Sequence, residues 1–109
     1  MFKLGFYVPP SHLESVKAAL FAAGAGRIGN YDSCAWQTLG QGQYRPLNGS
    51  QPYQGQTGVV EAVEAYRVEL VCADELMKKV VQALRTAHPY EEPAFDIVRL
   101  EQINPTNPG

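Results

Sequence analysis

The order of the elements constrains the fold of this sequence more than any other feature, because a strand followed by a helix occurs twice. An apolar, aromatic segment over residues 2–8 precedes a helical pattern over 11–23. Alternating residues over 59–72 precede an amphipathic stripe over 74–87, and an apolar segment over 95–103 follows. With a further strand region in the middle of the chain, this order is typical of the split βαβ pattern of the ferredoxin-like fold.

We therefore predict an α+β fold, a ferredoxin-like βαββαβ sandwich whose two helices cover one face of an antiparallel sheet. The 109 residues have the size of one small domain. We assign that domain to residues 1–103 and a polar tail to residues 104–109. No further element is left to cover the second face of the sheet, so we expect another subunit there.

The middle of the chain is nearly free of charge. Over residues 28–60 only Asp32 and Arg45 are charged, and six of the ten glycines lie here. Residues 31–47 are rich in aromatic side chains and predict a bent or twisted strand pair around Gly40–Gly42. We interpret the whole stretch as an extended, ordered Gly-rich excursion between the two halves, suited to contact with another subunit.

Residue types that favour helix ends mark both helices. Ser11 followed by Glu14 matches a capping box for the first helix, and Asp74 stands where it would cap the second. Pro89 disfavours helical backbone at the residue before it. The second helix is therefore predicted to end near Ala87.

Composition and charge exclude two classes of partner. The formal net charge is -2, so we expect no basic surface for nucleic acid or for an anionic membrane. No apolar run approaches the roughly 18 residues that a membrane span needs. Cys34 and Cys72 lie far apart and form no C-x-x-C pair, which favours free thiols in a reducing compartment. We expect a cytoplasmic protein.

The segment Gly24–Gly29 matches the G-x-G-x-x-G pattern of dinucleotide-binding loops. That chemistry needs a strand before the pattern and a helix after it, so that a helix N-terminus meets the pyrophosphate. Here the pattern follows a helix and precedes a strand. We therefore predict a helix end followed by a tight turn at Gly29 and Asn30.

The densest polar cluster runs from His88 to Pro93, where an imidazole, a phenol and two carboxylates lie between two prolines. Imidazole nitrogen and carboxylate oxygen suit a divalent metal such as zinc or copper, which makes His88, Glu91 and Glu92 candidate ligands. A closed metal site needs three or four ligands, and His12 is the only other histidine. The alternative is that His88 and Glu91 bond the backbone and hold the loop.

Aromatic residues supply the remaining candidates. Tyr31, Tyr44 and Tyr53 accompany the single tryptophan, Trp36, in the Gly-rich stretch, and Tyr90 belongs to the polar cluster. We take Tyr31, Trp36, Tyr44 and Tyr90 as candidates for lining a ligand pocket or contacting another subunit. No combination of Ser, His and Asp, or of Cys and His, supports nucleophilic catalysis. We predict no catalytic residue and no certain cofactor.

Three segments together resemble the domain inserted in the NGG-interacting-factor-like (YqfO-type) proteins. The segments are residues 24–31, residues 40–46 leading to Gly49, Pro52 and Gly55, and residues 88–96. The resemblance implies a fold like that of the P-II signalling and CutA proteins, ferredoxin-like and commonly trimeric. In full-length members, two flanking halves supply the ligands of a dinuclear metal centre. The resemblance therefore implies an insert domain standing alone, without hydrolase activity.

These observations leave three hypotheses about function. The first is a non-catalytic binding or regulatory module that forms a homo-oligomer, a trimer or a dimer, and takes an unknown small ligand. The alternative is a CutA-like protein that binds a divalent metal through the His88-Glu91-Glu92 loop. A small enzyme with a site between subunits is the third.

Overall fold

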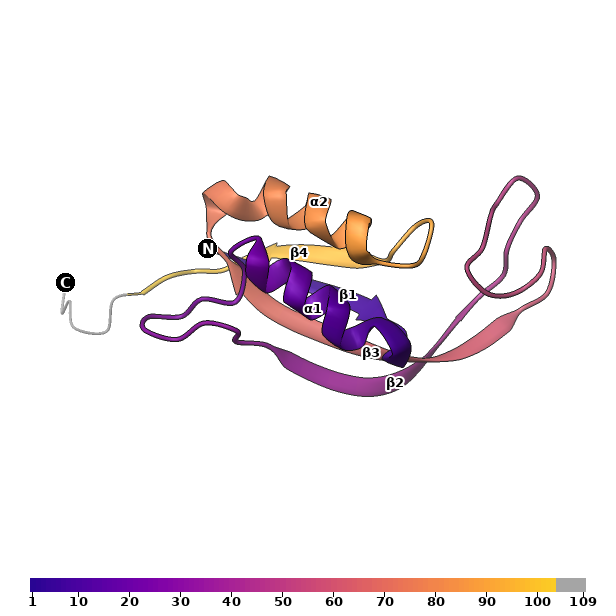
Figure 1. Cartoon of the computed structure of the whole chain (residues 1–109), viewed down its shortest axis with the longest axis horizontal. Helices are drawn as coiled ribbons and strands as arrows, with labels where there is room; N and C mark the ends of the chain where they lie inside the picture. Colours follow the sequence, from indigo (N-terminus) through magenta and orange to yellow (C-terminus); the bar gives the residue numbers. More distant parts are fainter. Residues whose placement is uncertain (104–109) are drawn as a thin grey trace.

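The computed structural model describes residues 1–103 and shows a four-stranded antiparallel sheet with two helices on one of its faces (Figure 1). The strands lie in the order β2-β3-β1-β4. In chain order the elements are β1 (Phe2–Val8), η1 (Pro10–His12), α1 (Leu13–Ala22), β2 (Trp36–Tyr44), β3 (Glu61–Cys72), η2 (Asp74–Leu76), α2 (Met77–Ala87) and β4 (Phe95–Arg99). The predicted ferredoxin-like βαββαβ sandwich is confirmed.

The core lies between the helices and one face of the sheet. Alternation along β1 directs Leu4, Phe6 and Val8 toward the helices, and all three are fully buried. Burial of a large apolar side chain contributes about 1.5–3 kcal/mol, so this layer supplies most of the favourable free energy of folding. The buried residues that complete it come from β3 and from the inner stripes of both helices: Val68, Leu70, Cys72, Leu13, Val16, Leu20, Met77, Val80 and Leu84.

Both helices begin with a short 3-10 turn, and neither has the predicted side-chain cap. The Ser11 hydroxyl lies 2.8 Å from Nδ1 of His12 instead of bonding a backbone amide. The Asp74 carboxylate binds the amino group of Met1 and the guanidinium of Arg99. The predicted capping box and Asp74 cap are wrong, because these neighbouring groups occupy the same side-chain oxygen atoms.

One continuous strand, β2, runs through Gly40 and Gly42 and pairs with β3 in unbroken register from Trp36 to Tyr44. The strand pair predicted around Gly40–Gly42 therefore forms with a partner remote in sequence, and Figure 1 shows the pair curved. Neither glycine has a positive φ. Beyond this pairing, residues 45–60 form a projecting loop at one end of the molecule (Figure 1).

The glycine pattern after α1 forms the predicted helix end and tight turn. Gly24 and Gly26 have positive φ angles of 105° and 78°, which residues with a side chain rarely adopt. Ile28 and Tyr31 then exchange backbone hydrogen bonds of 2.9 and 3.0 Å around the two residues between them. The pattern leads into a strand, so it presents no helix N-terminus to a pyrophosphate.

Two predicted strand bounds differ from the structure. β3 begins at Glu61, slightly later than predicted, and β4 ends at Arg99 instead of residue 103. The predicted polar tail over 104–109 lies outside the described residues. Across residues 1–103, no helix has the length and apolar character that crossing a lipid bilayer requires.

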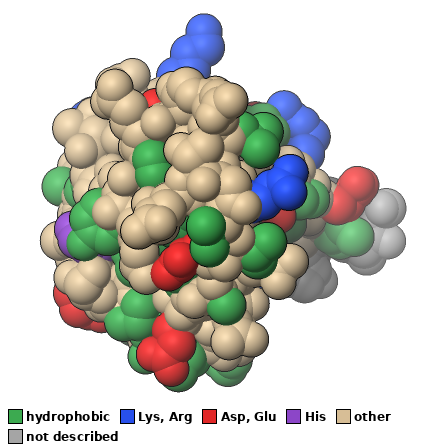
Figure 2. Space-filling model, turned by 90° about the vertical axis from the view of Figure 1, so that its right-hand side faces the viewer, with side chains coloured by type: hydrophobic (Ala, Val, Ile, Leu, Met, Phe, Trp, Pro, Cys, Tyr) green, Lys and Arg blue, Asp and Glu red, His purple; other side chains and the backbone are tan. Residues whose placement is uncertain are grey.

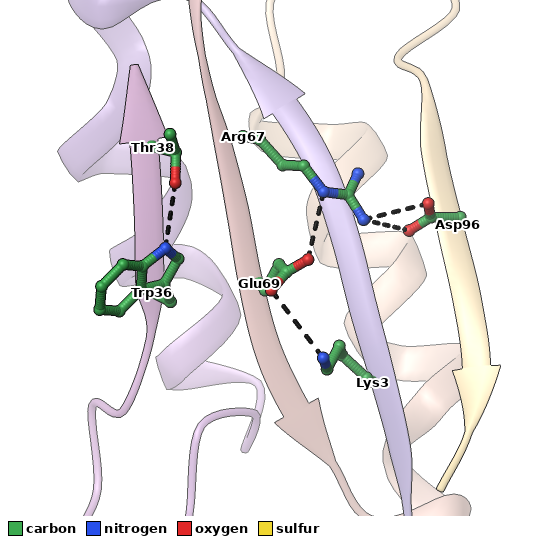
Figure 3. Close-up of polar contacts among 6 residues, drawn as sticks. All are labelled: Lys3, Trp36, Thr38, Arg67, Glu69 and Asp96. Atoms are coloured by element: carbon green, nitrogen blue, oxygen red, sulfur yellow. Dashed lines mark hydrogen bonds and ion pairs between the residues drawn. The ribbon is translucent and has the colours of Figure 1, made fainter. Parts of the chain in front are cut away.

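The face of the sheet that points away from the helices, here called the open face, carries a group of four charged side chains (Figure 3). Arg67 of β3 donates to both carboxylate oxygens of Asp96 at 3.1 Å and to Glu69 at 3.2 Å. Lys3 of β1 lies 3.9 Å from the second oxygen of Glu69. Two cations thus face two anions, and paired charges cost less to cover than unpaired ones.

Gly5 provides the space for this network. It lies opposite Asp96 on one side and Glu69 on the other, beneath the arginine that crosses β1 (Figure 3). A Cβ at position 5 would overlap Nη2 of Arg67 and Oδ1 of Asp96, and would lie 2.8 Å from Cζ of Arg67. A glycine inside a strand is therefore needed here for a close approach by another group.

We predict that Gly5→Ala lowers the free energy of unfolding by about 1 kcal/mol, because the new methyl group displaces Arg67 from Asp96. In an Arg67→Ala background the same change should be neutral or stabilising. The overlap with the guanidinium is then gone, and the exposed Asp96 carboxylate, no longer held by Arg67, can turn away from the methyl group. Alanine also loses less backbone entropy on folding than glycine does. Chemical denaturation of the four proteins tests this, and equal destabilisation in both backgrounds would contradict the role of Gly5.

Candidate functional site

A cavity of about 570 Å³ lies where the projecting loop meets the end of the sheet. Because four tyrosines line it, we call it the tyrosine cavity: Tyr7, Tyr44, Tyr53 and Tyr90. Three of the strand residues among its other lining groups, Gly42, Val63 and Ala65, belong to the open face, whereas Gln43 alternates to the other side of β2. These other groups are Gly42, Gln43, Arg45, Pro46, Leu47, Ser50, Pro52, Val63, Ala65, Glu91, Glu92 and Ala94. Figure 2 views the molecule from the loop end, where uncharged groups cover most of the surface.

The aromatic rings around the cavity contact one another and two histidines. The ring centroids of Tyr44 and Tyr53 lie 6.0 and 6.1 Å from that of Tyr90. His88 packs against Tyr90 at 4.8 Å, and His12 meets Tyr53 edge-on at 5.6 Å. Tilted and edge-on contacts of this kind are favourable between aromatic rings. They connect the projecting loop with η1 and with the segment after α2.

Hydrogen bonds hold the projecting loop in its position around the cavity. The Tyr44 hydroxyl donates to the carbonyl of Gln54 at 2.6 Å, and the Gln54 side-chain amide donates to Glu61 at 3.1 Å. The backbone amide of Gln51 donates to the Glu91 carboxylate at 3.2 Å. The loop, in which Arg45 is the only charged residue, is therefore held by polar contacts with the ends of β2 and β3 and with the segment after α2.

His88 anchors the wall of the cavity to the central part of the sheet. The residue is 6% exposed, and its Nε2 lies 2.6 Å from the carbonyl oxygen of Tyr7. Its Nδ1 accepts a hydrogen bond of 3.1 Å from the backbone amide of Tyr90. These partners require a neutral ring that carries its proton on Nε2. Burial lowers the pKa of His88, which favours the same neutral form.

The phenols of Tyr44 and Tyr90 are protonated at neutral pH. Burial raises the pKa of both Tyr44 and Tyr90, and the charge of Glu61 raises the pKa of Tyr44 further. The hydroxyl oxygen of Tyr90 is buried and has no hydrogen-bond partner within residues 1–103. A buried hydroxyl without a partner costs free energy. The cavity therefore offers mainly aromatic faces to a ligand.

The structure brings some of the predicted site residues together and separates others. Tyr44, Tyr90, Glu91 and Glu92 all line the tyrosine cavity, and His88 lies directly behind Tyr90. Trp36 stands at the other end of β2, where its Nε1 donates to the Thr38 hydroxyl at 3.0 Å (Figure 3). Tyr31 belongs to the turn after α1 and is 75% exposed.

Sequence reasoning left Tyr7 and Tyr53 out of the candidate set. A signal for Tyr7 was present, because it alternates with the buried residues Phe6 and Val8 and must face the other side of β1. Tyr53 lies in a loop without periodicity. No pattern there indicates which way its ring points.

The predicted metal ligands do not form a cluster in the described part of the chain. Within residues 1–103, no group of three or more His, Cys, Asp or Glu side chains is placed to hold a metal ion. Glu91 and Glu92 are exposed, whereas His88 is buried and bonded to backbone through both nitrogens. A divalent metal at these residues stays a prediction, and it would require His88 to release one backbone partner.

Comparisons with known proteins agree with this fold and with the resemblance. No protein-family model matches the sequence. A Mycobacterium leprae protein named GTP cyclohydrolase 1 type 2 homolog is 48% identical over 94 residues, which cover 86% of this chain and 24% of that protein. The chain therefore spans about a quarter of the length of the curated relatives that it matches.

Two solved structures are also similar to this chain. A Bacillus cereus protein related to NIF3 is 40% identical with a TM-score of 0.80, over 93% of this chain and 26% of that one. CutA1 from Pyrococcus horikoshii has a TM-score of 0.70 at 17% identity, over 97% of this chain and 89% of that one, which shows the fold alone. The chain thus has the CutA-like and P-II-like ferredoxin-like fold and is similar to one segment of NIF3/YqfO-type proteins.

The bonding of His88 predicts how stability depends on pH. Its pKa in the folded protein lies below the ordinary value of 6.5, so the unfolded chain binds the proton more readily. The free energy of unfolding should therefore be at its full value above about pH 7 and fall as the pH drops through 6.5, by at most roughly 1.4 kcal/mol per pH unit.

Denaturation between pH 5 and 8, roughly the interval in which histidine titrates, measures this loss. His88→Gln should flatten the dependence, because the replaced side chain no longer takes up a proton. His12→Gln is the matched control and should keep most of it, because burial is the main cause of the lowered pKa of His88 and the charge of His12 is a smaller one. If the pH dependence of stability survives in His88→Gln and disappears in His12→Gln, the titrating group is His12 and the prediction is wrong.

Proposed function

We propose that this chain is a self-associating, non-catalytic binding or regulatory module, the counterpart of the domain inserted in NIF3/YqfO-type proteins. The observation that carries the proposal is β2, a nine-residue edge strand that is almost entirely exposed. It contains no charged residue and no proline. Monomeric proteins protect such edges with charges, prolines or bulges. An unprotected edge of this length favours pairing with a second copy of the chain.

The open face supports the same proposal. Trp36, Tyr7 and Val98 lie on it with exposed fractions of 69%, 44% and 54%. Exposed aromatic and aliphatic side chains around a neutral group of paired charges are typical of a surface that another protein covers. The helices cannot cover this face, because both pack on the opposite one (Figure 1).

The total surface also favours association. The chain exposes 7327 Å², whereas a compact monomer of 12.0 kDa exposes about 6,000 Å². An association that covers part of the open face would reduce the exposed surface.

The chemistry of the tyrosine cavity supports binding more than catalysis. The imidazole of His88 is bonded to two backbone groups, and the phenols of Tyr44 and Tyr90 hold their protons at neutral pH. A general base must be free to take a proton from a substrate. We therefore assign the cavity a binding role.

Sedimentation of the purified chain at micromolar concentrations tests the association. The wild type should have two or three times the 12.0 kDa mass of the chain. Trp36→Glu places a charge on the open face beside the unprotected edge, and it should shift the protein toward monomer because a buried charge is costly.

Gln82→Glu is the matched control, since it adds the same charge to an exposed position on α2. This variant should assemble like the wild type. A wild type that stays at 12.0 kDa throughout the concentration series contradicts the proposal. Equal dissociation of both variants would show that added charge, and not its place, controls the assembly.

A further inference from the structure

The size and the lining of the tyrosine cavity indicate which class of molecule it can bind. Its volume of about 570 Å³ falls within the range of small-molecule sites, roughly 300–1,000 Å³. Tyr44 and Tyr53 each contact Tyr90, so three rings from two loops and a strand end surround the same space. The faces of such rings attract cations through their negative quadrupoles. The rings thus suit a ligand that is both apolar and positively charged.

The charged residues around the cavity also favour a positively charged ligand. Glu91 and Glu92 line it, and Glu61 lies close enough to Tyr44 for its charge to act on that phenol. Arg45 is the only cationic side chain among the lining residues. Sites for phosphate or carboxylate ligands need several Arg, Lys or backbone donors. Three carboxylates against one guanidinium therefore disfavour an anion and favour a cation.

The ring of Tyr90 lines the cavity, but its hydroxyl oxygen is buried away from solvent and has no partner within the described residues. The Tyr44 hydroxyl is already used by the carbonyl of Gln54. A ligand would therefore be bound through the ring faces and the carboxylates beside them.

We propose that the tyrosine cavity binds a small organic cation, an ammonium group carried on an aromatic or aliphatic body. This deepens the binding role proposed above and rests on it. The apolar body lies against the rings of Tyr44, Tyr53 and Tyr90. The ammonium group lies over a ring face on the side of Glu91 and Glu92, which keep it partly solvated at the mouth.

Three probes of the same size separate charge from shape. Phenethylammonium is the cation, 2-phenylethanol is its neutral counterpart, and phenylacetate carries the opposite charge. Calorimetric titration at low salt should show phenethylammonium binding at least about threefold more tightly than the alcohol. Phenylacetate should bind more weakly than either. Equal affinity for the cation and the alcohol, preference for the anion, or no binding of any probe at millimolar concentration overturns the proposal.

Variants locate the binding site. Tyr53→Leu keeps an apolar side chain at a half-exposed position and should weaken phenethylammonium binding about fivefold, with a smaller effect on the alcohol. Glu92→Gln should weaken binding of the cation alone. Glu75→Gln, an exposed change in η2, is the matched control and should have no effect. Unchanged cation affinity in both Tyr53→Leu and Glu92→Gln overturns the assignment to this cavity.

The same titrations with Trp36→Glu distinguish this proposal from that of self-association. Trp36 does not line the cavity. A wild type that binds the cation and sediments as a monomer would support the cavity and contradict the assembly. A Trp36→Glu variant that is monomeric and still binds the cation would show that the cavity does not depend on the assembly. An assembled wild type that binds none of the probes would contradict the cavity and leave the assembly standing.

Discussion

The arrangement of this molecule depends on one constraint: two short helices cover only one face of a four-stranded sheet. On the covered face, alternation along β1 and β3 buries an unbroken apolar layer. The open face has no such cover, and it combines exposed aromatic residues with paired charges. Gly5 lets Arg67 cross the central part of the sheet to Asp96, which neutralises charges that would otherwise stand alone. Because Gly5 has no side chain, these charges can pair, and the paired charges make the open face easier for another copy of the chain to cover.

A single buried histidine connects this sheet with the tyrosine cavity. His88 bonds the carbonyl of Tyr7 at the end of β1 and the amide of Tyr90 in the cavity wall. The wall is therefore attached to a strand in the interior of the sheet, although it belongs to a loop. A binding site whose walls are held in advance loses less entropy when a ligand enters. This bonding explains why an imidazole beside carboxylates acts here as a structural residue.

The elements that sequence reasoning predicted correctly are those whose pattern follows from burial. The alternation before Cys72 and the stripe through Val80 and Leu84 exist because one side of each element meets the core. The predicted caps failed because Asp74 finds Met1 and Arg99, partners that are remote in sequence. The partner of the strand through Gly40–Gly42 could not be predicted, because β3 is remote in sequence. Two of the four tyrosines of the cavity, Tyr44 and Tyr90, could be predicted, but the position of Tyr53 depends on how the loop returns to Tyr90.

The position of the cavity links the two proposals. Tyr7, Gly42 and Val63 belong to its lining and also to the open face, which a second copy would cover. Two binding events that share a surface are coupled, and the coupling is reciprocal: a ligand that strengthens assembly must itself bind more tightly to the assembled form. The paired charges of Arg67 and Asp96 lie beside this shared surface. A second copy that covers them would therefore change the electrostatic potential near the cavity. A module built in this way would report the presence of its ligand through its state of association, without any catalytic step.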